Sequence, residues 1–231
     1  TPFASLPVNT AGERGLRGIA LHPQFANNGR IYVCYSRSDS GAVSSNVEAI
    51  VDNRVVYVSA SDGGDVADSG EVFVASLPVS SNAARIGGRI AFGPDRKLYV
   101  ALGDMTSDDF AQDPNTLYGK VLRYNDDGTI PDDNPWTGSP VFAVGFGDPV
   151  ALTFDPVSDY AFVLERTDPD SYEVDRVQAK SNYGWPDVLG VADTEAELAF
   201  VAEHPYYADA LFDTGVRHVE FAGLVFNPSG K

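Results

Sequence analysis

Few side chains in this sequence belong to the types that usually perform acid–base or nucleophilic chemistry. The three histidines are His22 in a proline turn, His204 before a proline, and His218 in a strand-like stretch. These settings favour packing roles over catalysis. No Gly-x-Ser-x-Gly motif occurs, and the single cysteine, Cys34, lies in an apolar run that predicts a buried structural thiol.

Carboxylates are abundant instead, and carboxylates bind hard cations when six or more oxygens converge. Aspartate pairs occur at 108–109, 126–127 and 132–133. None of them has the spacing of a twelve-residue EF-hand loop, so we expect solvated loops there. The formal net charge of −17 argues against nucleic acids and anionic membrane surfaces as partners. No apolar run approaches the roughly 18–20 residues of a membrane helix, so no membrane insertion is expected.

The elements that must position these residues form a repeat. Each copy is an apolar strand, a turn containing proline, and a second apolar strand, which predicts a hairpin. Successive copies lie about 60 to 70 residues apart, which leaves room for two more strands in each. The strands at 55–58 and 71–75 are examples. The hairpins are expected near 18–35, 88–103, 149–164 and 222–231.

Four strands in each repeat predict an all-β fold, a β-propeller of four-stranded antiparallel blades. Residues 1–231 would form one domain of about three to four blades. A propeller needs a closed ring, so we expect the sequence to be a truncated piece of a longer chain. The alternative is a small two-sheet sandwich with coincidental repeats. The best helical candidate is short, Thr194–Ala202.

Five motifs occur in order along these repeats. They are GERGLRGIALHPQF at 12–25, GGRIAFGPD at 87–95, AQDPN at 111–115, DGTIPDDNP at 127–135 and SNYGWP at 181–186. Together they resemble the glucose/sorbosone dehydrogenase family. The resemblance implies a six-bladed propeller in the full-length protein and a periplasmic or secreted location. It also implies oxidation of aldose sugars to lactones, with pyrroloquinoline quinone and calcium as cofactors and an unidentified electron acceptor.

One family motif carries the catalytic base. Family members have a histidine in the pattern His-x-x-Gly-Arg, and the corresponding residues here run from Arg85 to Arg89. Arginine stays protonated at any relevant pH, so Arg85 cannot take the proton of a sugar hydroxyl. The position that the resemblance assigns to catalysis therefore lacks a base.

The resemblance also implies a set of cofactor-binding positions. In this sequence they are Glu13, Arg89, Asp104, Gly147 and Asp148. The family has Arg-Asn-Pro where this chain has Gly147 and Asp148 followed by proline. A cation and an amide are thus replaced by a residue without a side chain and by an anion. An anion would repel a tricarboxylate such as this quinone.

The family's calcium loop corresponds to residues 165–169. The resemblance implies oxygen ligands from Glu165, Asp168, Pro169 and Glu173, with backbone carbonyls contributing. The alternative is a solvated acidic loop.

The sequence leaves two other functions open. One is a propeller that has lost catalysis and binds a small molecule or a protein across its blade-end loops, and the other is a calcium-dependent lactone hydrolase.

Overall fold

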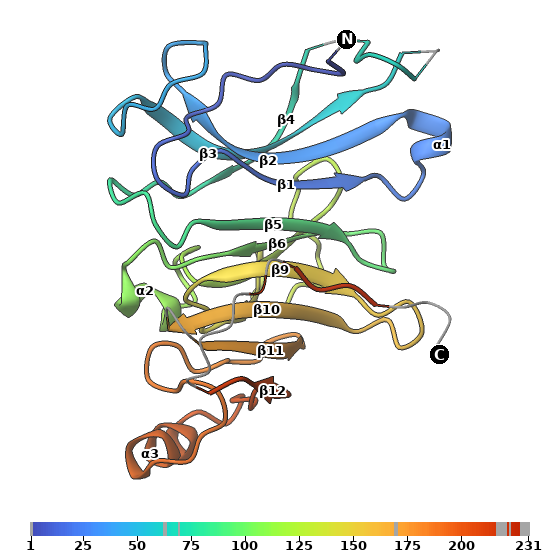
Figure 1. Cartoon of the computed structure of the whole chain (residues 1–231). Helices are drawn as coiled ribbons and strands as arrows, with labels where there is room; N and C mark the ends of the chain where they lie inside the picture. The colour runs from blue at the N-terminus through green and yellow to red at the C-terminus, as the bar shows by residue number, and fades with distance from the viewer. Residues whose placement is uncertain are drawn as a thin grey trace.

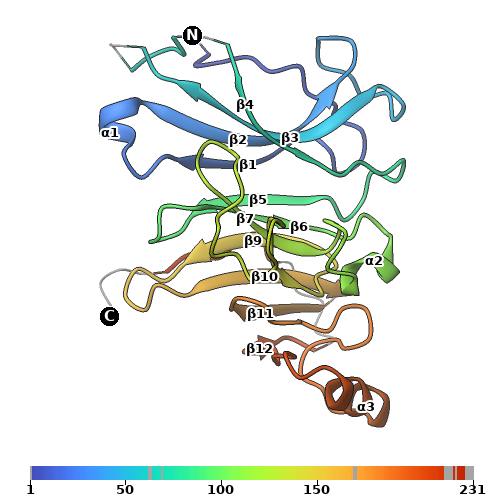
Figure 2. The same ribbon diagram turned by 180° about the vertical axis from the view of Figure 1, so that it is seen from behind.

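The computed structural model describes residues 2–61, 64–68, 70–168, 171–215, 221 and 223–226. These residues form three four-stranded antiparallel sheets that follow one another along the chain and stack face to face (Figure 1). Short helices connect some of the strands, and in the view from behind α2 and α3 lie beside the second and third sheets (Figure 2). No helix among the described residues is long and apolar enough to span a bilayer.

Each sheet uses four consecutive strands. The first contains β1 (Leu16–Leu21), β2 (Arg30–Ser38), β3 (Ile50–Ser59) and β4 (Val72–Leu77), with helix α1 (Phe25–Asn28) between β1 and β2. The second contains β5 (Gly87–Phe92), β6 (Leu98–Leu102), β7 (Lys120–Tyr124) and β8 (Val141–Val144), with α2 (Asp108–Gln112) after β6. The third contains β9 (Pro149–Phe154), β10 (Ala161–Asp168), β11 (Ser171–Val177) and β12 (Phe212–Asp213), with α3 (Glu195–Glu203) before β12.

This order confirms the predicted all-β fold of four-stranded antiparallel blades. The first two strands of each sheet pair as a hairpin, for example with Ile19 opposite Val33 and Ile90 opposite Val100. Of the strands expected between the first two hairpins, 55–58 lies within β3, and 71–75 overlaps β4 except at its first residue. The helical candidate is α3, which begins after Thr194 with a capping box. The fourth expected hairpin, 222–231, lies largely outside the described residues, and residues 223–226 contain no strand.

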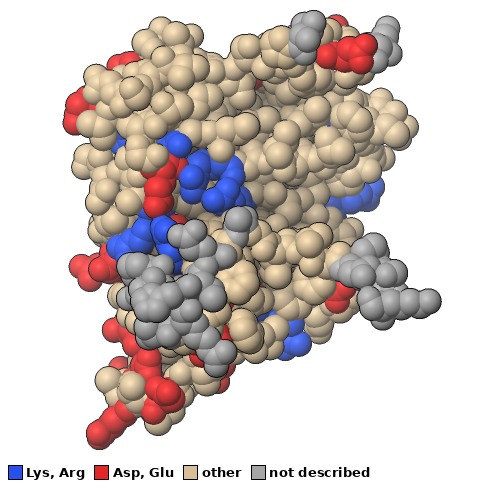
Figure 3. Space-filling view, viewed as in Figure 1, with Lys and Arg blue, Asp and Glu red and all other residues tan. Residues whose placement is uncertain are grey.

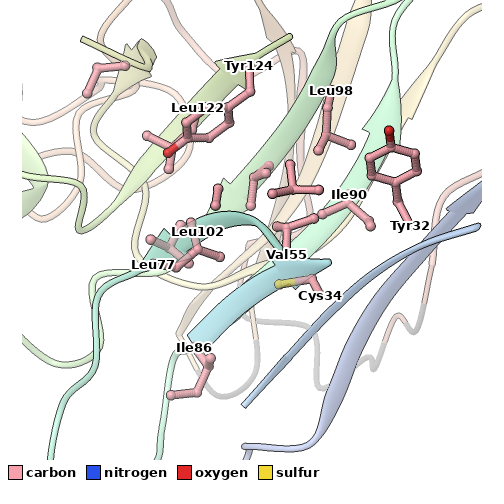
Figure 4. Packing of buried hydrophobic residues seen from close by; sticks show 14 of the residues in the cluster. Tyr32, Cys34, Val55, Leu77, Ile86, Ile90, Leu98, Leu102, Leu122 and Tyr124 are labelled. Atoms are coloured by element: carbon pink, nitrogen blue, oxygen red, sulfur yellow. The ribbon is translucent and has the colours of Figure 1, made fainter. Parts of the chain in front are cut away.

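Apolar side chains between the sheets hold the blades together. Tyr32, Cys34 and Val55 from the first sheet pack against Ile90 and Leu98 from the second (Figure 4). Burial raises the pKa of the Cys34 thiol to about 12, which agrees with the expected structural role. A second cluster, which includes Val121, Ala143, Val163 and Val177, joins the second and third sheets. The stacking fixes the innermost strands relative to each other, with β5 between β1 and β9.

The starts of these innermost strands converge at one end of the blades. The turn before β1 is bonded to the segment before β5, because Glu13 N–H donates to the Ala83 carbonyl at 2.7 Å. The segment after β6 reaches the segment before β9 through Asp104 N–H and the Gly147 carbonyl, 2.9 Å apart. Four loops from three blades therefore meet at this end.

Candidate functional site

Arg85, the residue at the expected base position, is held by carboxylates. Its Nε lies 2.9 Å from Oδ1 of Asp104, and its Nη2 donates to Oδ1 of Asp108 at 2.5 Å. The guanidinium carbon also lies 5.1 Å from the ring centre of Trp185, within cation–π range. The Arg85 side chain is 23% exposed and Asp108 53%, so this pair faces solvent.

Asp104 lies beneath that pair and is fully buried. Its Oδ2 accepts the indole N–H of Trp185 at 2.8 Å, and its Oδ1 accepts the backbone N–H of Thr106 at 2.8 Å. Burial raises its pKa to about 6, against the opposing effect of these donors and of Arg85. Both oxygens are occupied, so Asp104 anchors its neighbours and cannot reach a substrate.

The backbone is crowded and strained around these side chains. A Cβ at Gly103 would collide with the Arg85 carbonyl, and a Cβ at Gly147 would lie 2.6 Å from the Trp185 ring, so glycine is needed at both positions. Arg85, Met105 and Thr106 have φ values of 49°, 53° and 64°. Left-handed conformations of non-glycine residues cost about 1–3 kcal/mol each and concentrate at functional sites.

A second ion-paired group adjoins the first. Asp148 is 2% exposed, and its carboxylate is paired with the guanidinium of Arg166. Arg166 also reaches Oε1 of Glu13 at 3.0 Å, and the other oxygen of Glu13 accepts the backbone N–H of Arg85 at 2.7 Å. Burial raises the pKa of Asp148 and the charge of Arg166 lowers it, with burial the larger effect.

These six residues form one set, which we call the arginine–carboxylate network: Glu13, Arg85, Asp104, Asp108, Asp148 and Arg166. Arg17 and Arg89 flank it, since Arg17 donates to the Gly87 carbonyl at 3.0 Å and Arg89 donates to the Arg17 carbonyl at 2.8 Å. Burial lowers the pKa of Arg89. In the space-filling view, basic and acidic atoms lie side by side on the left of this face, over the starts of the innermost strands (Figure 3). The charges there are mixed.

Three further carboxylates adjoin the network through the backbone of Gly147 and Asp148. We call them the acidic trio: Glu165, Glu173 and Asp175. Glu165 of β10 is directly opposite Glu173 of β11, and Asp175 lies two residues further along β11 on the same face. Their side chains are 0%, 3% and 1% exposed. One oxygen from each lies within 4.8 Å of the others, the arrangement that a shared metal ion requires.

The electrostatics of the acidic trio are unfavourable for three charged carboxylates. Burial raises the pKa of all three well above the ordinary values, and repulsion among them adds to this effect. Two oxygens, Oε2 of Glu165 and Oδ2 of Asp175, are buried without a hydrogen-bond partner. Buried carboxylate oxygens without partners are costly, so this donor set fits the calcium that the family resemblance implies.

The structure therefore brings together most of the residues singled out in the sequence, in two groups. Glu13, Arg85, Asp104 and Asp148 share the network, and Gly147 joins it to the trio. The metal ligands expected from sequence were Glu165, Asp168, Pro169 and Glu173. Pro169 and the side chain of Asp168 lie outside the described residues.

Sequence reasoning missed the roles of Asp175 and Arg166. The alternation of acidic residues at 173 and 175 was the signal for Asp175, because alternate residues of a strand share a face. The signal for Arg166 was a charge exchange, since an arginine on β10 pairs with the unexpected Asp148, which directly precedes β9.

No histidine near the network can supply a base in the described part of the chain. His22 lies next to Asp126, 3.3 Å away, and packs edge-on against Phe92, as expected for a packing residue. His204 stacks on Phe200 and bonds its carbonyl through Nδ1 at 2.7 Å. His218 lies outside the described residues. The site offers guanidiniums, carboxylates and one indole for binding.

Comparison with known proteins gives matches to one family and to its relatives. The model of the family described as Glucose / Sorbosone dehydrogenase matches residues 2–227. An aldose sugar dehydrogenase of Escherichia coli is 32% identical over 193 residues, covering 80% of this chain and 50% of that protein. The hedgehog-interacting protein of Homo sapiens is 32% identical over 165 residues, covering 64% of this chain and 23% of that protein.

A solved structure shares the blade arrangement. The quinone-bound aldose sugar dehydrogenase of Streptomyces coelicolor superimposes with a TM-score of 0.73 at 28% identity. The match covers 90% of this chain and 55% of that one. The chain spans about half the length of the curated relatives it matches.

Proposed function

The chain belongs to the glucose/sorbosone dehydrogenase family, and we propose that it binds a sugar or related polyhydroxylated molecule without oxidising it through the quinone. The observation that carries the proposal is the state of Arg85. Its guanidinium, at the position that the resemblance assigns to the base, is ion-paired to Asp104 and Asp108. A guanidinium fixed by two carboxylates remains protonated, so no base is available there.

The neighbouring acids do not replace that base. Asp104 is buried with both oxygens bonded, and Asp148 is buried against Arg166. A general base must reach the proton that it removes, within hydrogen-bond distance or through one water. Asp108 is exposed; burial raises its pKa, but its hydrogen bonds to Arg85 and Asp104 and the charge of Arg85 together lower the pKa below its ordinary value. A lower pKa makes Asp108 a weaker base.

The residues present do not fit the quinone. The guanidiniums of Arg17, Arg85, Arg89 and Arg166 are matched by the carboxylates of Glu13, Asp104, Asp108 and Asp148. A tricarboxylate needs an excess of positive charge, and burying it beside Asp148 would add like-charge repulsion. A neutral sugar needs no such excess, and its hydroxyls can both donate to Asp108 and accept from Arg85.

The first test measures oxidation directly. The protein is supplied with the quinone and calcium, and aldose-dependent reduction of a dye is followed. We expect none, and we expect calorimetry to detect no quinone binding. The Arg85→His variant restores a base but keeps Asp148, so we expect it to remain inactive. Dye reduction by the wild-type protein would overturn the proposal, and activity of the variant alone would refute the argument about the cofactor.

The second test measures sugar binding by calorimetry or ligand-detected NMR with a panel of aldoses and sugar alcohols. We expect binding that Asp108→Ala weakens, because this exposed carboxylate accepts bonds from hydroxyls. Asp109→Ala is the matched control, since Asp109 is the exposed neighbour and is not part of the network. Equal loss in both variants, or no binding across the panel, would contradict the proposal.

A protein partner is the second candidate function. The similarity to the hedgehog-interacting protein favours it, since the name of that relative states a protein partner. This function places no requirement on Arg85. It predicts that loss of the Arg85–Asp108 pair leaves partner binding unchanged, whereas the sugar-binding proposal predicts a loss.

A further inference from the structure

A cavity of about 160 Å³ opens where the end of α2 meets the segment that follows α3. We call it the aromatic hollow, and its lining includes Gln112, Trp136, Lys180, Asn182, His204 and Tyr206. None of the six residues of the arginine–carboxylate network lines it. We propose that the aromatic hollow binds a small carboxylate built on one six-membered ring. The proposal is independent of whether the network binds a sugar.

Flat side chains give the hollow its shape. Trp136, His204 and Tyr206 each contribute an aromatic ring to the lining. The imidazole of His204 is fixed from behind, because it stacks on Phe200 with ring centres 3.8 Å apart and its Nδ1 bonds the Phe200 carbonyl at 2.7 Å. Aromatic faces gain contact area by stacking on another ring. A protein cavity of roughly 150 Å³ accommodates one benzene ring, so the hollow has the size of a single six-membered ring.

Hydrogen bonds hold the walls of the hollow in place. The side-chain amide of Asn182 donates to Oε1 of Gln112 at 2.7 Å, and Nε2 of Gln112 donates to the Trp185 carbonyl at 2.6 Å. The backbone N–H of Asn182 donates to the Tyr206 carbonyl at 2.9 Å. Small-molecule sites are usually preformed in this way, because binding then costs little ordering of side chains and loops.

A lysine gives the hollow a positive charge. The Nζ atom of Lys180 lies 4.4 Å from the centre of the Tyr206 ring, within cation–π range. In the described part of the chain no carboxylate forms an ion pair with Lys180, although acidic residues outnumber basic ones by 33 to 16. Lys180 also has a left-handed backbone conformation, with φ of 70°, which residues other than glycine seldom adopt.

The charge and the shape together select the ligand. The described residues that line the hollow include no aspartate or glutamate. Salt screens charges beyond about 8 Å at physiological ionic strength, so the nearby ammonium of Lys180 outweighs the distant excess of acidic residues. One ammonium balances the single charge of a carboxylate, whereas a phosphate group carries nearly two charges. Aromatic acids and uronic acids both present a ring that carries a carboxylate.

The first test follows the emission of Trp136 while benzoate or glucuronate is added, with benzyl alcohol and glucose as neutral counterparts. We expect a saturable change with at least one carboxylate and a weaker response to its counterpart. Trp136→Phe should remove the change, since the other tryptophan, Trp185, does not line the hollow. A response to benzoate alone identifies an aromatic acid, and a response to glucuronate alone identifies a sugar acid. No response to either carboxylate, or equal responses to the neutral counterparts, would overturn the proposal.

The second test separates charge from stacking by calorimetry, with folding checked by circular dichroism. Lys180→Met should weaken binding of the carboxylate by about threefold to fivefold and leave its neutral counterpart unaffected, since exposed ion pairs are weak. Lys97→Met removes the same charge outside the hollow and should change neither affinity. Tyr206→Leu should weaken both ligands, whereas Tyr160→Leu, at an exposed tyrosine outside the hollow, should weaken neither. Equal affinities in the Lys180→Met and Lys97→Met variants would refute the charge selection, and unchanged binding in Tyr206→Leu would place the ligand elsewhere.

Discussion

The arginine–carboxylate network and the acidic trio both bury carboxylates, but their side chains surround these carboxylates with opposite charges. In the network each carboxylate has a guanidinium partner, as Asp148 has Arg166 and Asp104 has Arg85. In the trio, three carboxylates face one another, and Glu165 and Asp175 each keep an oxygen without a partner. The network supplies its own counter-charge, whereas no cationic side chain in the described part of the chain is ion-paired to the trio, and the pKa values of its carboxyls are raised.

The two groups are nevertheless joined at Glu165. One of its oxygens accepts backbone N–H groups from the loop that carries Asp148, and the other belongs to the trio. Substitutions in the two groups should therefore change the free energy of unfolding in opposite directions at neutral pH when no cation is present. Loss of a partner in the network destabilises the protein, and loss of a charge in the trio stabilises it.

The largest effect is expected from Arg166→Met. This change leaves Asp148 buried without its ion-pair partner, and breaking such a pair costs about 3 kcal/mol of unfolding free energy. Urea unfolding of the wild-type and variant proteins measures it. The double variant with Asp148→Asn should recover much of the loss, because the stranded charge is gone. A double variant as unstable as Arg166→Met would show that the arginine acts through packing instead.

Glu173→Gln is expected to stabilise the protein at neutral pH in the presence of a chelator. The folded pKa of Glu173 is raised well above its ordinary value, so the unfolded carboxyl loses its proton at lower pH than the folded one. The stability that this group contributes is present below about pH 4 and is lost as pH rises.

The wild-type protein should therefore lose unfolding free energy between pH 4 and pH 7, and the variant should lose less. At pH 7 the variant should be the more stable of the two proteins, because its amide carries no negative charge that folding must bury. Urea unfolding across this pH range tests both statements. If the unfolding free energies of the wild-type protein and the variant changed identically with pH, Glu173 would not be the source of the pH dependence.

The fold was predictable because its signals are local and repeated. The apolar runs of the hairpins, the turn prolines and the spacing of the copies indicated four-stranded blades, and β3 and β4 lie where the spacing left room for them. The capping residues Thr194 and Glu197 marked the start of α3. How the blades stack could not be read in the same way, since packing of Tyr32 on Phe92 depends on side-chain shape across a large sequence separation.

The site was predictable as a set of positions but not as a set of contacts. The motifs indicated Glu13, Arg85 and Asp148, yet only the structure pairs Asp148, which directly precedes β9, with Arg166 of β10. The offset between β9 and β10 includes an irregularity near Glu165, and no sequence pattern fixes such a shift. The positive charge that is absent at Gly147 is thus supplied by Arg166 of the neighbouring strand β10.

The smallest effect is expected from Asp108→Asn, at the solvent-facing edge of the network. Asp108 is 53% exposed, and exposed ion pairs contribute about 0–1 kcal/mol that salt screens. Unfolding at low and high salt should show a loss of about 0.5 kcal/mol that vanishes at high salt, with Asp109→Asn as the unpaired control. Because Asp104 still holds Arg85 from below, the guanidinium keeps its place over Trp185. A loss as large as that of Arg166→Met would mean that Arg85 depends on solvent-exposed Asp108 as strongly as buried Asp148 depends on Arg166.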